Sequence, residues 1–148
     1  MDCTIYLLDY TAQITADDCV NCKIVVGPVD GSAFFRDCKG CTISVACRQL
    51  RTRDCHDMEF RVFCATQPSI ETSTGLRFGC WQAAWPGLSA QFKAAKLDPT
   101  RNTFAKVFDF NEGMELNGGA KHWLFLSGAE AAEVPWKARR IRDCCFLV

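Results

Sequence analysis

The stretch "DDCVNCKIVVGPVDGSAFFRDCKGC", residues 17–41, holds two Cys-x-x-Cys pairs, and their meaning decides the fold. Cys19/Cys22 and Cys38/Cys41 are separated by fifteen residues. At this spacing four thiolates can surround a zinc ion as a tetrahedron. The same spacing also suits a structural repeat that buries cysteines in each copy, so the rest of the chain must separate the two interpretations.

The cysteines belong to a repeat. The segments "DDCVNCKIVV", "RDCKGCTISV" and "RDCHDMEFRV" align with Cys19, Cys38 and Cys55 in one column, and "CTIYLL" from Cys3 fits one copy earlier. In the third copy the second cysteine is replaced by Met58. A closed zinc site does not accept a thioether in place of a thiolate, whereas a buried apolar column does. The repeat is therefore favoured over zinc, and we predict neither a structural metal nor a disulfide framework.

Apolar residues alternate after each cysteine pair, which is the period of a β-strand. They are Ile5, Ile24 with Val26, Ile43 with Val45, and Phe60 with Val62. A strand pattern that recurs every 17 to 19 residues indicates a solenoid. We therefore predict an all-β fold, a right-handed parallel β-helix in which the cysteines form inward ladders.

Composition restricts the class of protein. The chain has 148 residues, of which 17 are basic and 17 are acidic. Because its net charge is zero, it has no overall electrostatic attraction to nucleic acid or to an anionic membrane. Eleven cysteines without a signal peptide indicate reduced, buried thiols in the cytosol. No apolar run approaches the roughly 20 residues that span a bilayer. We expect a cytoplasmic, monomeric protein that binds no nucleic acid.

Downstream of the repeat the pattern changes. The segment "PGLSAQFKAAKL" predicts a helix at about 86–97, begun near Pro86 and stopped by Asp98-Pro99, that caps the open end of the solenoid. Phe104, Val107, Phe108 and Phe110 are expected to pack on the flank. The β-helix domain is thus assigned to 1–110, and 111–148 to a covering segment or the start of a linker or next domain.

The aligned coils also predict which side chains share the outer surface. Ile14, Ala33 and Leu50 form an inward column, which we continue with Ile70. The next residues point outward because side chains alternate along a strand; they are Thr15, Phe34, Arg51 and Glu71, followed by Asp17, Arg36, Arg53 and Ser73. Gln49 precedes Arg51 on the same strand. In this register Glu71 pairs with Arg51, and the face is either an interaction surface or a set of ordinary solvated charges.

Two segments of this face, "ACRQLRTRDC" and "ATQPSIETSTGLRFGCWQ", resemble the tubulin-cofactor-C-type β-helix domain. The resemblance extends from about Cys3 to Phe110 and includes "VGPVDGSAFFRDC" and "VFDF". It implies a GTPase-activating protein, with Arg51 as the arginine finger and Glu71 in partner binding. "ATQP" and "FGCWQ" are more similar to the branch that acts on an Arf-like GTPase than to the branch that acts on tubulin.

If the domain acts in this way, the aligned outward face gives further expectations about the site. Gln49 assists Arg51 in catalysis, and Phe34, Arg36, Arg48 and Arg53 contact the partner. Family members often have Gln where this chain has Arg48, which leaves the role of that side chain open. The protein needs no cofactor of its own, because GTP and Mg²⁺ come with a GTP-bound Arf-like GTPase. The alternatives are a tubulin-directed activator and a non-catalytic GTPase- or cytoskeleton-binding module.

The two ends of the chain carry further expectations. The start "MDCTIYLL" lies within a coil and suggests a fragment of a longer protein, which in full length is expected at the ciliary base or on a membrane. The end "CFLV" matches a prenylation signal at Cys145, or it begins the first strand of a following domain.

Overall fold

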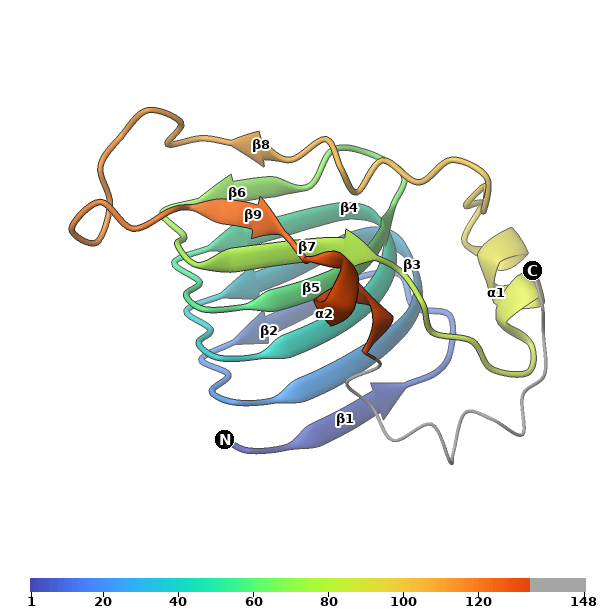
Figure 1. Cartoon of the computed structure of the whole chain (residues 1–148). Helices are drawn as coiled ribbons and strands as arrows, with labels where there is room; N and C mark the ends of the chain where they lie inside the picture. Colours follow the sequence, from blue (N-terminus) through green and yellow to red (C-terminus); the bar gives the residue numbers. More distant parts are fainter. Residues whose placement is uncertain (134–148) are drawn as a thin grey trace.

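Parallel strands stacked into coils make up most of the fold in the computed structural model, which describes residues 1–133 (Figure 1). Cys145 and the rest of "CFLV" lie outside the described residues. The elements are β1 (Thr4–Leu7), β2 (Ile14–Asp17), β3 (Lys23–Arg36), β4 (Thr42–Arg53), β5 (Glu59–Cys64), β6 (Ser69–Glu71), β7 (Leu76–Cys80), α1 (Leu88–Ala94), β8 (Phe108–Asp109), β9 (Trp123–Phe125) and α2 (Gly128–Ala132). The predicted parallel β-helix is confirmed.

The solenoid has two strand faces that meet at a bend. One face carries the order β1-β3-β4-β5-β7-β9, and the other consists of β2, the second halves of β3 and β4, then β6 and β8. The long strands β3 and β4 belong to both faces, since each turns the corner between Val26 and Ser32 or the equivalent positions. A Cβ on Gly27 at this corner would lie 2.5 Å from the carbonyl oxygen of Asp9, so the coils approach there too closely for any larger residue.

The turn before each cysteine explains why "DC" recurs in the sequence. The residue directly before the cysteine, or before Ser73 in the fourth coil, has a positive φ in every coil: Asp2, Asp18, Asp37, Asp54 and Thr72. Asp tolerates this left-handed conformation better than most residues, because its short side chain bonds to nearby backbone. A second left-handed position follows three residues later, at Asn21, Gly40, Asp57 and Gly75.

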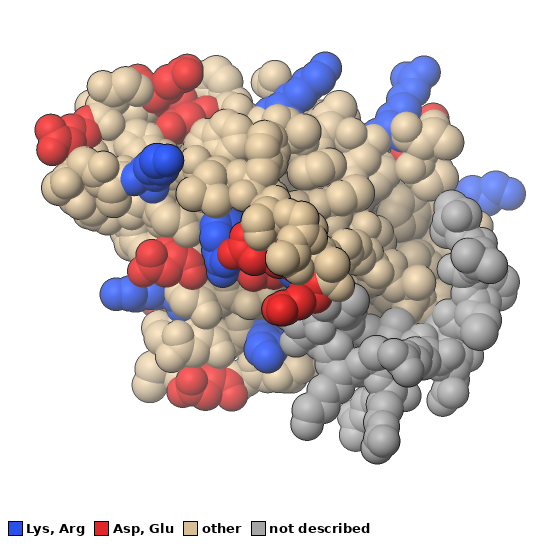
Figure 2. Space-filling view, viewed as in Figure 1, with Lys and Arg blue, Asp and Glu red and all other residues tan. Residues whose placement is uncertain are grey.

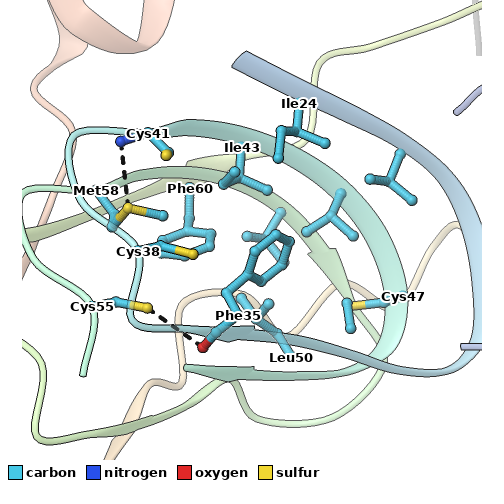
Figure 3. Packing of buried hydrophobic residues seen from close by; sticks show 14 of the residues in the cluster. Ile24, Phe35, Cys38, Cys41, Ile43, Cys47, Leu50, Cys55, Met58 and Phe60 are labelled. Atoms are coloured by element: carbon cyan, nitrogen blue, oxygen red, sulfur yellow. Dashed lines mark hydrogen bonds between the residues drawn. The ribbon is translucent and has the colours of Figure 1, made fainter. Parts of the chain in front are cut away.

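The core consists of ladders of identical or similar side chains (Figure 3). Cys22, Cys41 and Met58 stack in one ladder, in which the Cys41 N–H donates to the Met58 sulfur at 3.4 Å. Cys38 and Cys55 stack in another, which continues into Ser73, whose hydroxyl accepts from the Cys55 N–H at 3.1 Å. Within residues 1–133 no group of three or more His, Cys, Asp or Glu side chains has the geometry of a metal site.

Helix α1 does not cap the open end of the solenoid, and this part of the prediction was wrong. It is shorter than expected and lies against the corner of the coils (Figure 1). Its Phe92 packs on Phe63 with ring centroids 5.0 Å apart, beside Ala46 and Ala95. Phe63 and Ala46 are the solenoid residues of this cluster, and they point outward at the corner. The helix therefore buries a flank of the solenoid that would otherwise be apolar and exposed.

The open end is instead covered by the segment expected on the flank. Phe104, Val107 and Trp123 pack against the core cluster. Trp123 belongs to β9, which pairs with β7. Its ring lies 6.2 Å from that of Phe78 and extends the stack of core rings from Phe35, Phe60 and Phe78. Phe108 and Phe110 do not share this packing and remain 48% and 59% exposed.

A buried arginine holds α2 against the strands. The Arg61 side chain is 2% exposed and bonds Glu59 at 2.9 Å. It also donates to the backbone carbonyl oxygens of Glu130 and Ala131, at 2.8 and 3.0 Å. Figure 2 shows acidic and basic side chains side by side around α2, with charges of both signs over this face. Over the described part of the chain, no helix combines the length and the apolar character needed to cross a bilayer.

Candidate functional site

Three arginines project from neighbouring coils on the face formed by β2, β3, β4, β6 and β8. The register aligns Thr15, Phe34 and Arg51 in one outward column and Asp17, Arg36 and Arg53 in the next, as predicted. The prediction fails in the fourth coil, where Ser69 lies beside Arg51 and Glu71 lies beside Arg53. Ile70 pairs with Thr52 rather than Leu50, so Glu71 cannot be the partner of Arg51.

The arginines of the second column are paired with carboxylates. Arg36 donates two hydrogen bonds to Asp17, at 2.8 and 2.5 Å, and these bonds lower the pKa of the Asp17 carboxyl. The Arg53 Nε lies 3.7 Å from a carboxylate oxygen of Glu71. Both pairs are well exposed, so each contributes little stability but fixes the direction of its guanidinium.

Arg51 has a different environment. It is exposed, and within residues 1–133 its side chain forms neither an ion pair nor a hydrogen bond. Its guanidinium carbon lies 5.0 Å from the centroid of the Phe34 ring. Arg36 lies 5.6 Å from the same ring. A cation over an aromatic face is attracted to it without losing its hydrogen-bond donors. Phe34 therefore supports Arg51 while leaving all five of its N–H groups available to a ligand.

Gln49 lies one outward position before Arg51 on β4. It is exposed, and its side-chain oxygen accepts a hydrogen bond from the Ser32 hydroxyl at 3.2 Å. Ser32 is its register neighbour on β3, so two adjacent coils determine where the amide points. The structure thus brings Phe34, Gln49 and Arg51 together.

A groove of about 480 Å³ runs beside Arg51. Its lining combines polar and aromatic side chains, from Gln49, Arg51, Thr66, Gln67, Ser69, Phe108 and Phe110. The rings of Phe108 and Phe110 meet edge to face at 5.0 Å and form the wall toward the open end of the solenoid. We call this pair the aromatic wall.

Sequence reasoning missed the aromatic wall, because it expected Phe108 and Phe110 to pack on the flank of the solenoid. One signal was available. In "VFDF" the polar Asp109 separates Phe108 from Phe110, and in a strand this alternation places both phenylalanines on the face opposite the aspartate. Because β8 pairs with β6, that face is the one that carries Arg51.

Arg48 lies away from this face, at the corner beside α1. It donates to the Asp30 backbone oxygen at 2.7 Å and its carboxylate at 3.0 Å, and to the Ala95 carbonyl oxygen at 2.8 Å. Ala95 ends α1, where a cation satisfies the last carbonyl groups and complements the helix dipole. The bonds from Arg48 also lower the pKa of the Asp30 carboxyl. The structure thus gives Arg48 an anchoring position and does not bring it to the groove.

The comparisons with known proteins agree with this architecture. A family model described as "Tubulin binding cofactor C" matches residues 1–110. A solved structure, "Tubulin Binding Cofactor C from Leishmania major", superimposes with a TM-score of 0.71 at 26% identity and covers 88% of this chain and 89% of that chain. The chain belongs to the tubulin binding cofactor C family.

Curated relatives of two kinds are similar to the chain. "Protein XRP2" of Gallus gallus is 53% identical over 109 residues, and "Protein XRP2" of Danio rerio is 54% identical over 125. These alignments cover 74% and 84% of this chain but 30% and 32% of the relatives. "Tubulin-specific chaperone C" of Mus musculus is 28% identical over 135 residues, 91% of this chain and 39% of that protein. The chain therefore spans about a third of the length of these relatives.

Proposed function

We propose that this domain is a GTPase activator that inserts Arg51 into the nucleotide site of a GTP-bound Arf-like small GTPase. The observation that carries the proposal is the contrast among the arginines of one face. Arg36 and Arg53 face carboxylates, while Arg51 lacks an acidic partner within the described residues and lies on an aromatic ring beside a groove.

The chemistry of GTP hydrolysis suits such a residue. Negative charge spreads over the oxygens of the transferred phosphoryl group in the transition state, and a guanidinium can meet it with two hydrogen bonds. A donor that is already placed needs no reorganisation during the reaction. Arg51 lies mid-strand between two paired coils, so its backbone is held while its side chain is free to reach a partner.

Gln49 and the groove supply the remaining parts of the proposal. Gln49, held by Ser32, steadies the finger or a backbone carbonyl of the partner's switch region. The aromatic wall offers an apolar anchor, and Arg53 with Glu71 borders it with charge, a composition typical of binding hot spots. The partner brings nucleotide, Mg²⁺ and the attacking water, so this chain supplies residues and no cofactor.

Tubulin is the second candidate partner. The specific observation in its favour is the superposition on a tubulin binding cofactor C with 88% of this chain covered. The segments "ATQP" and "FGCWQ", which are more similar to the branch that acts on an Arf-like GTPase, favour that partner. A non-catalytic binding module would use the same groove without needing an unpaired cation.

Single-turnover hydrolysis tests the proposal. A panel of GTP-loaded Arf-like GTPases, and tubulin in parallel, is mixed with increasing concentrations of this protein. We expect acceleration of one or more Arf-like members by about 10³–10⁵ at saturation, the range of known arginine fingers. Binding to a GTP-loaded member without acceleration would identify a binding module, and acceleration of tubulin alone would assign the second partner.

A further inference from the structure

Two side chains from distant segments form a nearly buried polar pair behind the groove. The His122 Nδ1 lies 2.6 Å from a carboxylate oxygen of Asp109, with side chains 11% and 10% exposed. Asp109 is the residue of β8 between the two phenylalanines of the aromatic wall, and His122 comes directly before β9. We infer that the Asp109–His122 pair is the positioning element that holds the aromatic wall at the groove, and thereby determines affinity for the partner; this inference rests on the proposed function.

The wall needs such a support because β8 is short and its two rings make no contact with the core cluster. The strand has two residues, and its backbone bonds run to β6: the Phe108 N–H donates to Pro68 at 2.8 Å and the Phe110 N–H to Ile70 at 3.0 Å. The rings are about half exposed, and they contact each other across the face. Because Phe108 and Phe110 point outward, Asp109 supplies the inward side chain between them and, after Val107, the next side-chain tie to the body of the protein.

Asp109 uses both carboxylate oxygens in this role. One accepts from His122, and the other accepts from the backbone N–H of Asn111 at 2.8 Å. The side chain of Asn111 in turn accepts from the backbone N–H of Thr72 at 2.7 Å, next to Glu71. One polar chain therefore connects the covering segment, the aromatic wall and the turn after Glu71, and a partly buried chain of this kind is costly to break.

His122 is itself held in place by its neighbours along the chain. Its backbone oxygen accepts from the N–H of Leu76 at 3.0 Å, and Trp123 beside it packs on the core. The imidazole thus projects from a fixed backbone toward Asp109. The pair joins a well-packed element to a poorly anchored one, so its loss should loosen β8 and leave the arginine face intact.

The first arm of the test measures β8 without any partner. Amide hydrogen exchange, resolved by NMR, is compared for wild type, Asp109→Ala, His122→Ala, Asp109→Asn and His122→Asn. We expect the Phe108 and Phe110 amides to exchange about tenfold faster or more in both Ala variants. Asn at position 122 places an N–H near the position of Nδ1, and Asn at 109 keeps the oxygen for Asn111, so both Asn variants should exchange within about threefold of wild type.

The matched control is the other histidine, His56. It hydrogen-bonds Thr74 at 2.9 Å and Asn117 of the same covering segment at 3.3 Å, and neither partner belongs to β8. His56→Ala should leave the Phe108 and Phe110 amides at wild-type rates. His122→Ala guards against misfolding of Asp109→Ala, because it removes the same contact without disturbing the turn at Asn111.

The second arm measures activation of the GTPase that responds in the panel. Both Ala variants should raise the protein concentration for half-maximal rate about tenfold and leave the saturated rate within about twofold, while the Asn variants restore affinity. If wild type accelerates no GTPase, the proposed function fails and the exchange arm still decides the positioning role. Wild-type exchange at Phe108 and Phe110 in both Ala variants, or unchanged half-maximal concentrations despite faster exchange, would overturn the inference.

Discussion

Arg51 differs from the arginines around it in what it lacks. Each neighbour directs its donors at an acid on the same surface, and Arg48 directs them at the end of α1. Arg51 is oriented by the Phe34 ring, which attracts the cation without occupying an N–H group. A residue that is steadied but not neutralised is suited to meet charge that another molecule develops.

Glu71 provides a prediction at this scale. Because it faces Arg53, Glu71→Gln should weaken binding of the GTP-loaded partner about three- to thirtyfold and leave the rate at saturation unchanged. The free energy of unfolding should change by less than about 1 kcal/mol, since the pair is exposed. Isothermal titration and single-turnover hydrolysis measure the two effects separately.

Arg53→Ala and the double variant complete the comparison for Glu71. If the two residues act as a pair, the double variant should bind about as well as either single variant. A large loss of saturated rate in Glu71→Gln would instead place this carboxylate at Arg51, against the register found here.

At the scale of elements, the sequence predicts three coils correctly and misplaces the fourth. Cys19, Cys38 and Cys55 mark the first three, and the expected neighbours Phe34 with Arg51 and Arg36 with Arg53 are found. In the fourth coil the position equivalent to these cysteines is Ser73, which is a weaker marker. Without a cysteine to guide the alignment, Ile70 was aligned with Leu50 instead of Thr52. A slip of two residues keeps Ile70 inward and Glu71 outward, so alternation along β6 cannot detect it. It does move Ser73, which was predicted to point outward but is buried in the cysteine ladder.

The misplaced register had a detectable signal, whereas the position of α1 had none. "STGLRF" from Ser73 matches "CHDMEF" from Cys55 in its turn and its apolar positions, which gives the correct step. In contrast, the position of α1 depends on outward residues such as Phe63 and Ala46 meeting Phe92 across distant parts of the chain. Such contacts have no period, so the sequence predicts the helix but not the surface that it covers.

The cysteine ladders predict how stability depends on pH. Burial raises the pKa of the Cys41 thiol to about 11 from an ordinary 9.0. Between these values the folded chain keeps a proton that the unfolded chain releases, so the stabilisation is complete below about pH 9 and is lost as pH rises toward 11. We expect the free energy of unfolding, measured with urea under reductant, to fall between about pH 8 and about pH 10.5. The fall should be about 1–2 kcal/mol larger in wild type than in Cys41→Ala.

A surface thiol supplies the control for this pH dependence. Cys80 is exposed at the end of β7, outside the ladders, and Cys80→Ala should lose stability with pH as wild type does. Equal pH dependence in wild type and Cys41→Ala would contradict the assignment of Cys41 as a protonated, buried thiol.

At the scale of the whole molecule, the solenoid acts as a rigid support for a face assembled from several coils. Phe34, Arg51, Ser69 and Phe108 come from β3, β4, β6 and β8, which are adjacent through the parallel ladder although far apart in the sequence. The ladder fixes their spacing at about 4.8 Å per coil. A flat face of fixed spacing can present a cation and an apolar wall to a partner without a conformational change of its own.

The rate at saturation in Arg51→Ala shows whether Arg51 is an arginine finger. Single-turnover GTP hydrolysis by the responding GTPase is measured at saturating wild type, Arg51→Ala, Arg51→Lys and Arg53→Ala, with affinity for the GTP-loaded partner determined separately. We predict that Arg51→Ala keeps most of its affinity and loses about 10³–10⁵ in rate, and that Arg51→Lys largely fails because an ammonium lacks the planar fork. Arg53→Ala should weaken binding more than rate. A normal saturated rate for Arg51→Ala would mean that Arg51 is no arginine finger and that this face only binds the partner.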